Sequence, residues 1–452
     1  MAANADRPDG RRMTAKGRAT RERILQAAAE LILAEGLSEL SLDRVRKAAS
    51  VSGSQLAHYY ADKQALLRAV VARQIEVVLN FHRQPKLGGL ATFEDFEHWI
   101  DLNLRYLRRI GYDGTPTYHA LTGQLAKSDD ATRQTLAEGY ERWIELLEHS
   151  FQRMKDRGVL VTKADPRQLA LVVVAGHQGA ATLTFAYRQE WPLADTLRFV
   201  VNYLRLFAAD PAERVAGRPR RPRDRHPPQV VADDSAERFT RKGLATRTRI
   251  VEGAAQLMFD HGVSGISLND VRSAVGVSGS QLSHYFVDKR DLTRQVIAAR
   301  ANEVISFHTQ PQLGGLDSFQ ALRAWGDACV AQASAVYMRG GCIYGSLTGE
   351  LLEADGDVLD DLAAGYEQWL KLFHDGLAAM RRRGDLTDDA DPRHLAVALL
   401  AAHQGGALLT YTMGSAEPFS AMVNAALDYA GSFRPSPKRR TSRSVSRPKN
   451  KP

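Results

Sequence analysis

Hydrophobic residues recur at helical spacing along most of the chain. The first such series, which shares one face of a helix, consists of Ile24, Ala28, Leu31 and Ile32. Gly36 follows this series, as is typical of a helix C-terminus. The same spacing predicts further helices over residues 41–48, 52–59, 63–82, 92–109, 117–126, 131–156, 166–187 and 193–208. No segment alternates long enough to predict a strand, so we expect an all-α fold.

The pattern repeats at an offset of 226 residues. KGRATRERI (16–24) matches KGLATRTRI (242–250), and VSGSQLAHYYADK (51–63) matches VSGSQLSHYFVDK (277–289). This period is far longer than the roughly 20–50 residues of a solenoid unit. The chain therefore contains one whole domain twice, and we call the copies repeat one and repeat two.

Charge and cysteine content limit the kinds of site that the chain can carry. The net charge is +8, from 60 Lys and Arg against 52 Asp and Glu, but residues 434–452 hold eight of the basic residues and no acidic one. A polyanion-binding surface elsewhere must therefore be local. The two cysteines, Cys329 and Cys342, are too few for a disulfide framework or a multi-cysteine zinc site. We expect no metal and no cofactor.

The N-terminal sequence and the apolar runs predict a soluble, cytoplasmic protein with no membrane partner. MAANADRPDGRR lacks the apolar region of a signal peptide. Runs such as LALVVVAG (169–176) are shorter than the roughly 18 residues that span a bilayer.

Residues 41–60, SLDRVRKAASVSGSQLAHYY, predict two short helices joined by a tight turn. Ser52 begins the second helix and Gln55 follows three residues later, which is the pattern of a capping box. The same pattern recurs over 277–282. Such a pair is a helix-turn-helix, whose second helix can enter the major groove of DNA, about 12 Å wide.

Each repeat resembles the TetR family of bacterial transcriptional regulators. The shared features are a basic stretch, a first helix that ends in Gly, the helix-turn-helix, an aromatic pair and Asp-Lys at the start of a fourth helix. They cover residues 16–70 and 242–296, and the helical remainders resemble the family's ligand-binding and dimerisation region. The family usually has Gly in the turn, as at Gly276, whereas repeat one has Ser50. A left-handed turn would strain Ser50 by about 1–2 kcal/mol.

The resemblance divides the chain into seven segments. We expect a flexible basic arm (1–15), helix-turn-helix DNA-binding domains (16–65 and 238–291), helical ligand-binding and dimerisation domains (66–209 and 292–433), a Pro- and Arg-rich linker (210–237) and a disordered basic tail (434–452).

By this resemblance, the second helix of each motif and nearby basic residues contact double-stranded DNA. The candidates are Arg44, Arg46, Ser52, Gly53, Ser54, Gln55, His58, Tyr59 and Lys63 in repeat one and Arg272, Ser278, Gly279, Ser280, Gln281, His284, Tyr285 and Lys289 in repeat two. Gln55 and Gln281 can pair with an adenine edge, and Lys63 and Lys289 can hold phosphate. The alternatives are a structural His58, a Tyr59 that packs on the first helix, and a solvated Lys63.

Family members generally act as homodimers through their last two helices. The resemblance therefore implies either a pseudo-dimer within one chain or a homodimer between chains. The corresponding helices are 166–187, 193–208, 392–413 and 419–432. The alternative is that these helices pack only within each repeat. Because the recognition helices are nearly identical, we expect a near-palindromic operator.

Aromatic residues of the helical remainders are candidates for an apolar effector pocket, with core packing as the alternative for each. They are Trp99, Tyr118, Trp143, Trp325, Tyr344 and Trp369. The resulting hypothesis is a sequence-specific regulator, and by the family's usual mode a repressor, that responds to a small molecule. The alternative is a ligand-binding or protein-interaction module whose DNA affinity comes only from the basic tail. The sequence has no phosphate loop, metal-ligand cluster or Gly-x-Ser-x-Gly motif, so we expect no enzyme.

Overall fold

The computed structural model describes residues 13–37, 39–111, 118–214, 239–351, 354 and 356–435. Within these residues the regular elements are helices, and the one extended pairing is an isolated bridge between Leu160 and Ala208. The prediction of an all-α fold is therefore confirmed. Most of the expected arm, linker and tail lies outside the described residues.

Repeat one contains nine α-helices among its described residues. They are α1 (Ala15–Glu35), α2 (Leu42–Ala48), α3 (Gly53–Tyr59), α4 (Lys63–His82), α5 (Phe93–Ile110), α6 (Tyr118–Leu125), α7 (Asp130–Asp156), α8 (Pro166–Tyr187) and α9 (Trp191–Arg205), with short 3-10 turns η1 (Pro85–Leu87) and η2 (Pro211–Arg214). The ends of α2 to α9 differ from the predicted ends by at most three residues.

Repeat two follows the same order with one interruption. Its elements are α10 (Arg241–His261), α11 (Leu268–Val275), α12 (Gly279–Tyr285), α13 (Lys289–His308), η4 (Pro311–Leu316), α14 (Phe319–Gln332), η5 (Ala333–Tyr337), α15 (Met338–Gly340), α16 (Gly345–Glu350), α17 (Gly356–Arg383), α18 (Pro392–Met413) and α19 (Glu417–Gly431). The counterpart of the continuous helix α5 is thus α14, a π-helical turn η5 and α15 in succession.

Helices α8 and α18 are apolar on all sides because other helices enclose them. Both are long and apolar enough to cross a membrane by length and composition alone, but 94% and 89% of their most apolar windows are buried inside the protein. A helix that is hydrophobic all round is typical of a protein core. In each, an Asp N-cap and a Pro at the first helical position set the start, at Asp165 and Asp391.

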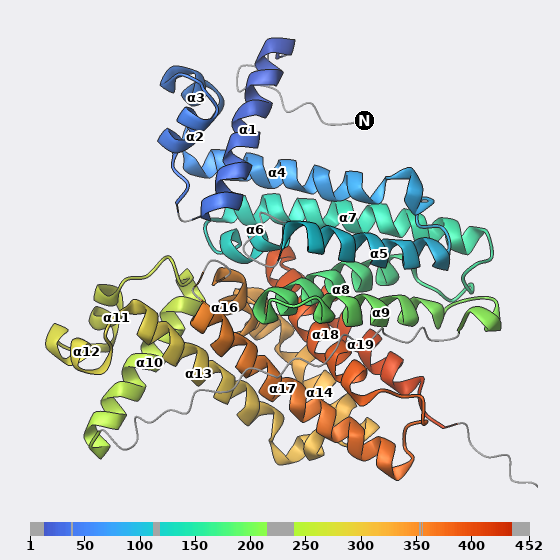
Figure 1. Cartoon of the computed structure of the whole chain (residues 1–452). Helices are drawn as coiled ribbons and strands as arrows, with labels where there is room; N and C mark the ends of the chain where they lie inside the picture. Colours follow the sequence, from blue (N-terminus) through green and yellow to red (C-terminus); the bar gives the residue numbers. More distant parts are fainter. Residues whose placement is uncertain are drawn as a thin grey trace, which may run out of the picture.

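The two repeats pack against each other through α8, α9, α18 and α19, which lie in the middle of the molecule (Figure 1). A Cβ on Gly179 of α8 would fall within 3.0 Å of the Ala401 carbonyl oxygen. A Cβ on Gly405 of α18 would meet the Ala175 carbonyl oxygen in the same way. These two contacts are the same contact with the repeats exchanged, since each residue is 226 positions from its counterpart.

A second glycine contact joins equivalent residues directly. A Cβ on Gly123 would lie 2.6 Å from the Cα of Gly349, and a Cβ on Gly349 would lie 2.8 Å from the Cα of Gly123. Equivalent residues that meet each other, and pairs that exchange roles, are the pattern of an isologous two-fold interface.

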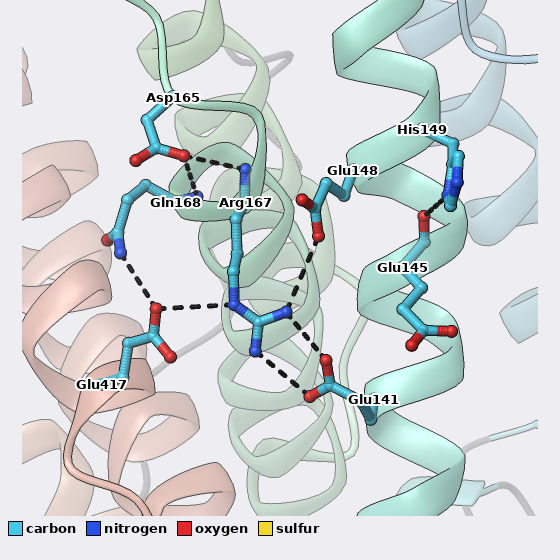
Figure 2. A network of polar contacts seen from close by, with 8 residues as sticks. All are labelled: Glu141, Glu145, Glu148, His149, Asp165, Arg167, Gln168 and Glu417. Carbon is cyan, nitrogen blue, oxygen red and sulfur yellow. Dashed lines mark hydrogen bonds and ion pairs between the residues drawn. The ribbon is translucent and has the colours of Figure 1, made fainter.

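Polar side chains line the rim of this interface, and they differ between its two halves. Arg167 contacts Glu141 and Glu148 of α7 at 2.8 and 3.6 Å and Glu417 of α19 at 3.6 Å (Figure 2). These contacts, chiefly the hydrogen bonds to Glu141, raise the pKa of the Arg167 guanidinium. Its counterpart Arg393 also pairs with a glutamate of the preceding long helix, Glu367, at 3.3 Å, but where Arg167 contacts Glu417 it lies over the Trp191 ring, 5.0 Å from the centroid. The ion pair to Glu417 in one half thus corresponds to a cation–π contact with Trp191 in the other, while the ion pairs to Glu141 and Glu367 are common to both.

A buried ion pair also crosses between the repeats. Lys127 Nζ lies 2.8 Å from Glu350 Oε1, and their side chains are only 8% and 6% exposed. Glu350 also accepts a hydrogen bond from the backbone amide of Val263, just beyond α10. The end of α6 in repeat one is therefore connected to the first helix of repeat two.

Replacing Gly405 with Ala should destabilise the protein by about 2–3 kcal/mol, because the added Cβ forces α8 and α18 apart. Denaturant unfolding of the full chain measures the change. The matched control is Gly431→Ala, since a Cβ at Gly431 meets nothing within 4 Å. Equal unfolding free energies for the wild type and Gly405→Ala would contradict the close approach of these helices.

Candidate functional site

The start of α3 is held by the predicted capping box. Ser52 Oγ accepts a hydrogen bond from the Gln55 amide at 3.1 Å, and Gln55 Oε1 accepts one from the Ser52 amide at 2.8 Å. In repeat two, Ser278 and Gln281 form the same pair at 3.1 and 2.9 Å. Buried Leu56 and Leu282 fix α3 and α12 on their own domains. The two helices therefore have the same local construction.

The two helices expose nearly the same polar surface, and they differ where Ala57 of α3 corresponds to Ser283 of α12. The exposed residues that they share, N-caps included, are Ser52, Gly53, Ser54, Gln55 and His58 at α3 and Ser278, Gly279, Ser280, Gln281 and His284 at α12. A Cβ on Gly53 or Gly279 would meet nothing within 4 Å, so the backbone is open at these positions. The two DNA-binding domains lie apart from each other, at the upper and left edges of the molecule in the view of Figure 1.

The capping role of Gln55 limits how it can read a base. Pairing with an adenine edge uses both the carbonyl and the amino group of a glutamine side chain. In Gln55 the carbonyl Oε1 already accepts the Ser52 amide, so the Nε2 group remains to donate. The same holds for Gln281. A bidentate contact would require the capping bond to open.

The predicted tyrosines are partly structural. Tyr59 is half-buried, and its hydroxyl donates to the Gly17 carbonyl of α1 at 3.2 Å. Tyr285 is also half-buried, and its ring lies 5.2 Å from that of Phe239. These residues hold each recognition helix on its first helix while part of the ring remains accessible.

Several residues that were predicted to contact phosphate bind other groups of the protein instead. Arg44 pairs with Glu35 and Glu39, and Arg46 pairs with Asp43 at 2.7 Å. In repeat two, Lys289 Nζ donates to the Ile266 carbonyl at 2.6 Å, and burial lowers the pKa of this lysine. Lys63 is half-buried, and Arg272 is exposed. The positive surface beside the recognition helices is therefore weaker than the number of basic residues suggests.

One exposed residue near α12 escaped the sequence analysis. Val287 follows the recognition helix and is 90% exposed. Its counterpart in repeat one is Ala61. The sequence feature that could have indicated it is an apolar side chain in the loop before Asp288. Such a side chain can contact the methyl group of thymine.

The turn before each recognition helix is left-handed, as predicted. Ser50 has φ 51° and Gly276 has φ 66°. Glycine adopts this conformation without a steric penalty, whereas a residue with a Cβ is strained there. Repeat one therefore carries strain that repeat two lacks.

Repeat one also has an apolar cavity of about 130 Å³, formed by α4 to α9 and open to solvent beside the exposed Val77. Of the six predicted effector contacts, Tyr118 and Trp143 line it. Trp99 lies in the core and donates to His82 Nε2 at 3.0 Å.

The three predicted contacts in repeat two also lie in the core. Trp325 and Trp369 both donate to His308 Nε2 at 2.9 Å. Tyr344 is buried and donates to the Leu362 carbonyl at 2.8 Å.

The polar groups of the cavity come from residues that the sequence analysis did not assign to it. His177 Nε2 lies 3.1 Å from Asn103 Oδ1, and His119 Nδ1 lies 3.0 Å from Gln178 Oε1. Burial lowers the pKa of His119 to about 4 and that of His177 to about 3, so both rings are neutral near pH 7. Among the described lining residues there is no Asp, Glu, Lys or Arg.

Models of known protein families match the DNA-binding domain and the C-terminal helical domain of each repeat. The family model described as bacterial regulatory proteins, tetR family, matches residues 24–70 and 250–296. The tetracyclin repressor-like C-terminal domain matches 318–426, and the LmrA/YxaF-like transcriptional regulator C-terminal domain matches 92–198. The chain belongs to the TetR family. It is a helix-turn-helix transcriptional regulator with a duplicated unit, and its family is not one of enzymes.

Three individual relatives have a low sequence identity to this chain. The transcriptional regulator UidR of Escherichia coli K12 is 24% identical over 144 residues, which cover 32% of this chain and 69% of UidR. The transcriptional repressor DhaR of Mycobacterium sp. is 23% identical over 173 residues, or 38% of this chain and 85% of DhaR. The crystal structure of regulatory protein TetR from Rhodobacter sphaeroides is similar at 20% identity and a TM-score of 0.38, covering 41% of this chain and 98% of that one.

Replacing Ser50 with Gly should stabilise the protein by about 1 kcal/mol, because the left-handed turn then carries no Cβ. The reciprocal change, Gly276→Ser, should destabilise it by a similar amount. Calorimetry of the two variants beside the wild type measures both effects. A Ser50→Gly variant no more stable than the wild type would show that the turn is not strained.

Proposed function

We propose that the chain is a ligand-responsive repressor whose two repeats form the dimer within one polypeptide. The reciprocal glycine contacts between α8 and α18 support this arrangement most directly. Such contacts bring two repeats together as two separate subunits would meet in a two-fold dimer. DhaR, one of the similar proteins, is named as a repressor, which supports that mode of action. We further propose that the protein works in the cytoplasm, where its DNA would lie.

A near-palindromic operator follows from the similarity of the recognition helices. Both begin with the same capping box and, apart from Ala57 and Ser283, expose the same residue types. The half-sites are therefore expected to be almost equal. Exposed Ala57 and Ala61 of repeat one correspond to Ser283 and Val287 of repeat two, so small differences are expected beside these positions.

Effector binding in the cavity of repeat one would act on both DNA-binding domains. Val78 and His82 of α4 line the cavity, and α4 begins directly after α3. Tyr118 and His119 of α6 also line it, and Lys127 beyond α6 forms the ion pair with Glu350 beside α10. A ligand that favours one position of α4 and α6 would thereby change operator affinity.

Selection from randomised duplex DNA, followed by native mass spectrometry of the complex, tests the proposal. A near-palindrome bound by one chain is expected. The same palindrome bound by two chains would replace the intrachain dimer by a homodimer. Failure to enrich any sequence would contradict operator binding. Loss of all binding after removal of residues 434–452 would favour the module whose DNA affinity comes only from the tail.

The variants His58→Ala and His284→Ala should each weaken operator binding about 5- to 30-fold, because each removes one exposed side chain from one recognition helix. Each should relax selectivity in a single half-site, and repeated selection with each variant measures this. Equal loss in both half-sites from either variant would argue against one recognition helix per half-site.

A further inference from the structure

We propose that each chain has a single effector site, in repeat one, and that Tyr337 and Phe419 occupy the equivalent space in repeat two. The inference rests on the proposed effector-binding function of the cavity. It concerns which repeat binds and what chemistry it accepts.

The first observation is that equivalent histidines of the two repeats have different hydrogen-bond partners. In repeat one, His177 Nε2 lies 3.1 Å from Asn103 Oδ1, and both residues line the cavity. In repeat two, Cys329 stands in the place of Asn103. The partner of His403 Nε2 is there the hydroxyl of Tyr337, at 2.9 Å. The tyrosine thus reaches the histidine that in repeat one faces the cavity.

The second observation is the size of the side chains. Tyr337 corresponds to Gly111, and Phe419 corresponds to Leu193, which lines the cavity of repeat one. The Tyr337 ring lies 4.6 Å from that of Phe419 and 5.3 Å from that of His403. Both aromatic residues are buried, at 5% and 0% exposure. Two large rings therefore stand where repeat one has a glycine and a leucine.

The backbone of repeat two accommodates this tyrosine. Helix α5 ends at Ile110, and Gly111 caps it with φ 82°. In repeat two the helical path continues through the π-helical turn η5 and α15 before Gly341 takes the same role with φ 76°. A π turn inserts a residue into the helical register. Tyr337 is the last residue of this turn, and its side chain is buried.

The third observation is an unpaired donor in repeat one. Trp143 lines the cavity and is 1% exposed, but its Nε1 has no hydrogen-bond partner among the described residues. The counterpart Trp369 donates to His308 Nε2 at 2.9 Å. A buried polar group without a partner is uncommon, and here it belongs to the repeat that carries the cavity. The two repeats therefore differ in the bonding of this tryptophan as well as of the histidine.

The cavity indicates the class of this ligand. Its volume of about 130 Å³ is close to the roughly 150 Å³ of an engineered apolar cavity that holds benzene. The neutral side chains of His119, His177 and Gln178 provide hydrogen bonds but no charge. Burying an ion there without a partner would be costly. The site fits an uncharged molecule of about one aromatic ring that carries a hydrogen-bond acceptor.

Calorimetric titration of the full chain with phenol tests the assignment, because phenol is uncharged near pH 7 and offers both an acceptor and a donor. One equivalent per chain is expected. Leu193→Phe, which copies repeat two into repeat one, should weaken phenol binding about ten-fold or more. The reverse variant, Tyr337→Ala with Phe419→Leu, should raise the stoichiometry to two equivalents, and Phe419→Leu alone serves if the double variant does not fold.

Three results would overturn the proposal: two equivalents in the wild type, no binding of phenol to it, or unchanged affinity in Leu193→Phe. Failure of a folded reverse variant to gain a site would overturn the role of Tyr337 and Phe419. The titration contains no DNA. Operator selection can therefore succeed while this inference fails, and the two failures are distinguishable.

Discussion

The close approach of α8 and α18 is the contact on which the rest of the structure depends. Two helices come together so tightly at Gly179 and Gly405 that neither position has room for a Cβ. Both helices are buried almost completely, and each supports the remaining helices of its own repeat. This helix pair fixes the positions of the cavity, of the charged residues at the edge of the interface and of the helices that carry the DNA-binding domains.

Features that depend on neighbours in the chain could be predicted from the sequence. Helix spacing, the capping box at Ser52 and the left-handed turn at Ser50 need only a few consecutive residues, and the described structure contains them. Features that depend on distant residues could not. The pairing of Arg44 with Glu35 joins two helices, and the burial of Tyr337 follows from a π turn that shifts the register. The hydrophobic pattern carries no signal for either.

Duplication has preserved the backbone more closely than the side chains. The glycine contacts are reciprocal, but Arg167 meets a carboxylate where Arg393 meets an indole ring. The cavity of repeat one and the aromatic filling of repeat two show the same divergence in the core. A dimer of two different subunits would need two separate genes. When one chain carries both repeats, the side chains of each repeat can change independently.

Joining both repeats in one polypeptide also changes how assembly depends on copy number. Separate subunits pair in proportion to the square of their concentration, so scarce proteins spend much of their time as monomers. Repeats on one chain meet at an effective concentration that the length and stiffness of their linker set. The contact between α8 and α18 is intramolecular, so dilution does not weaken it. In the proposed intrachain dimer, a cell with only a few such molecules therefore retains them all in the paired form.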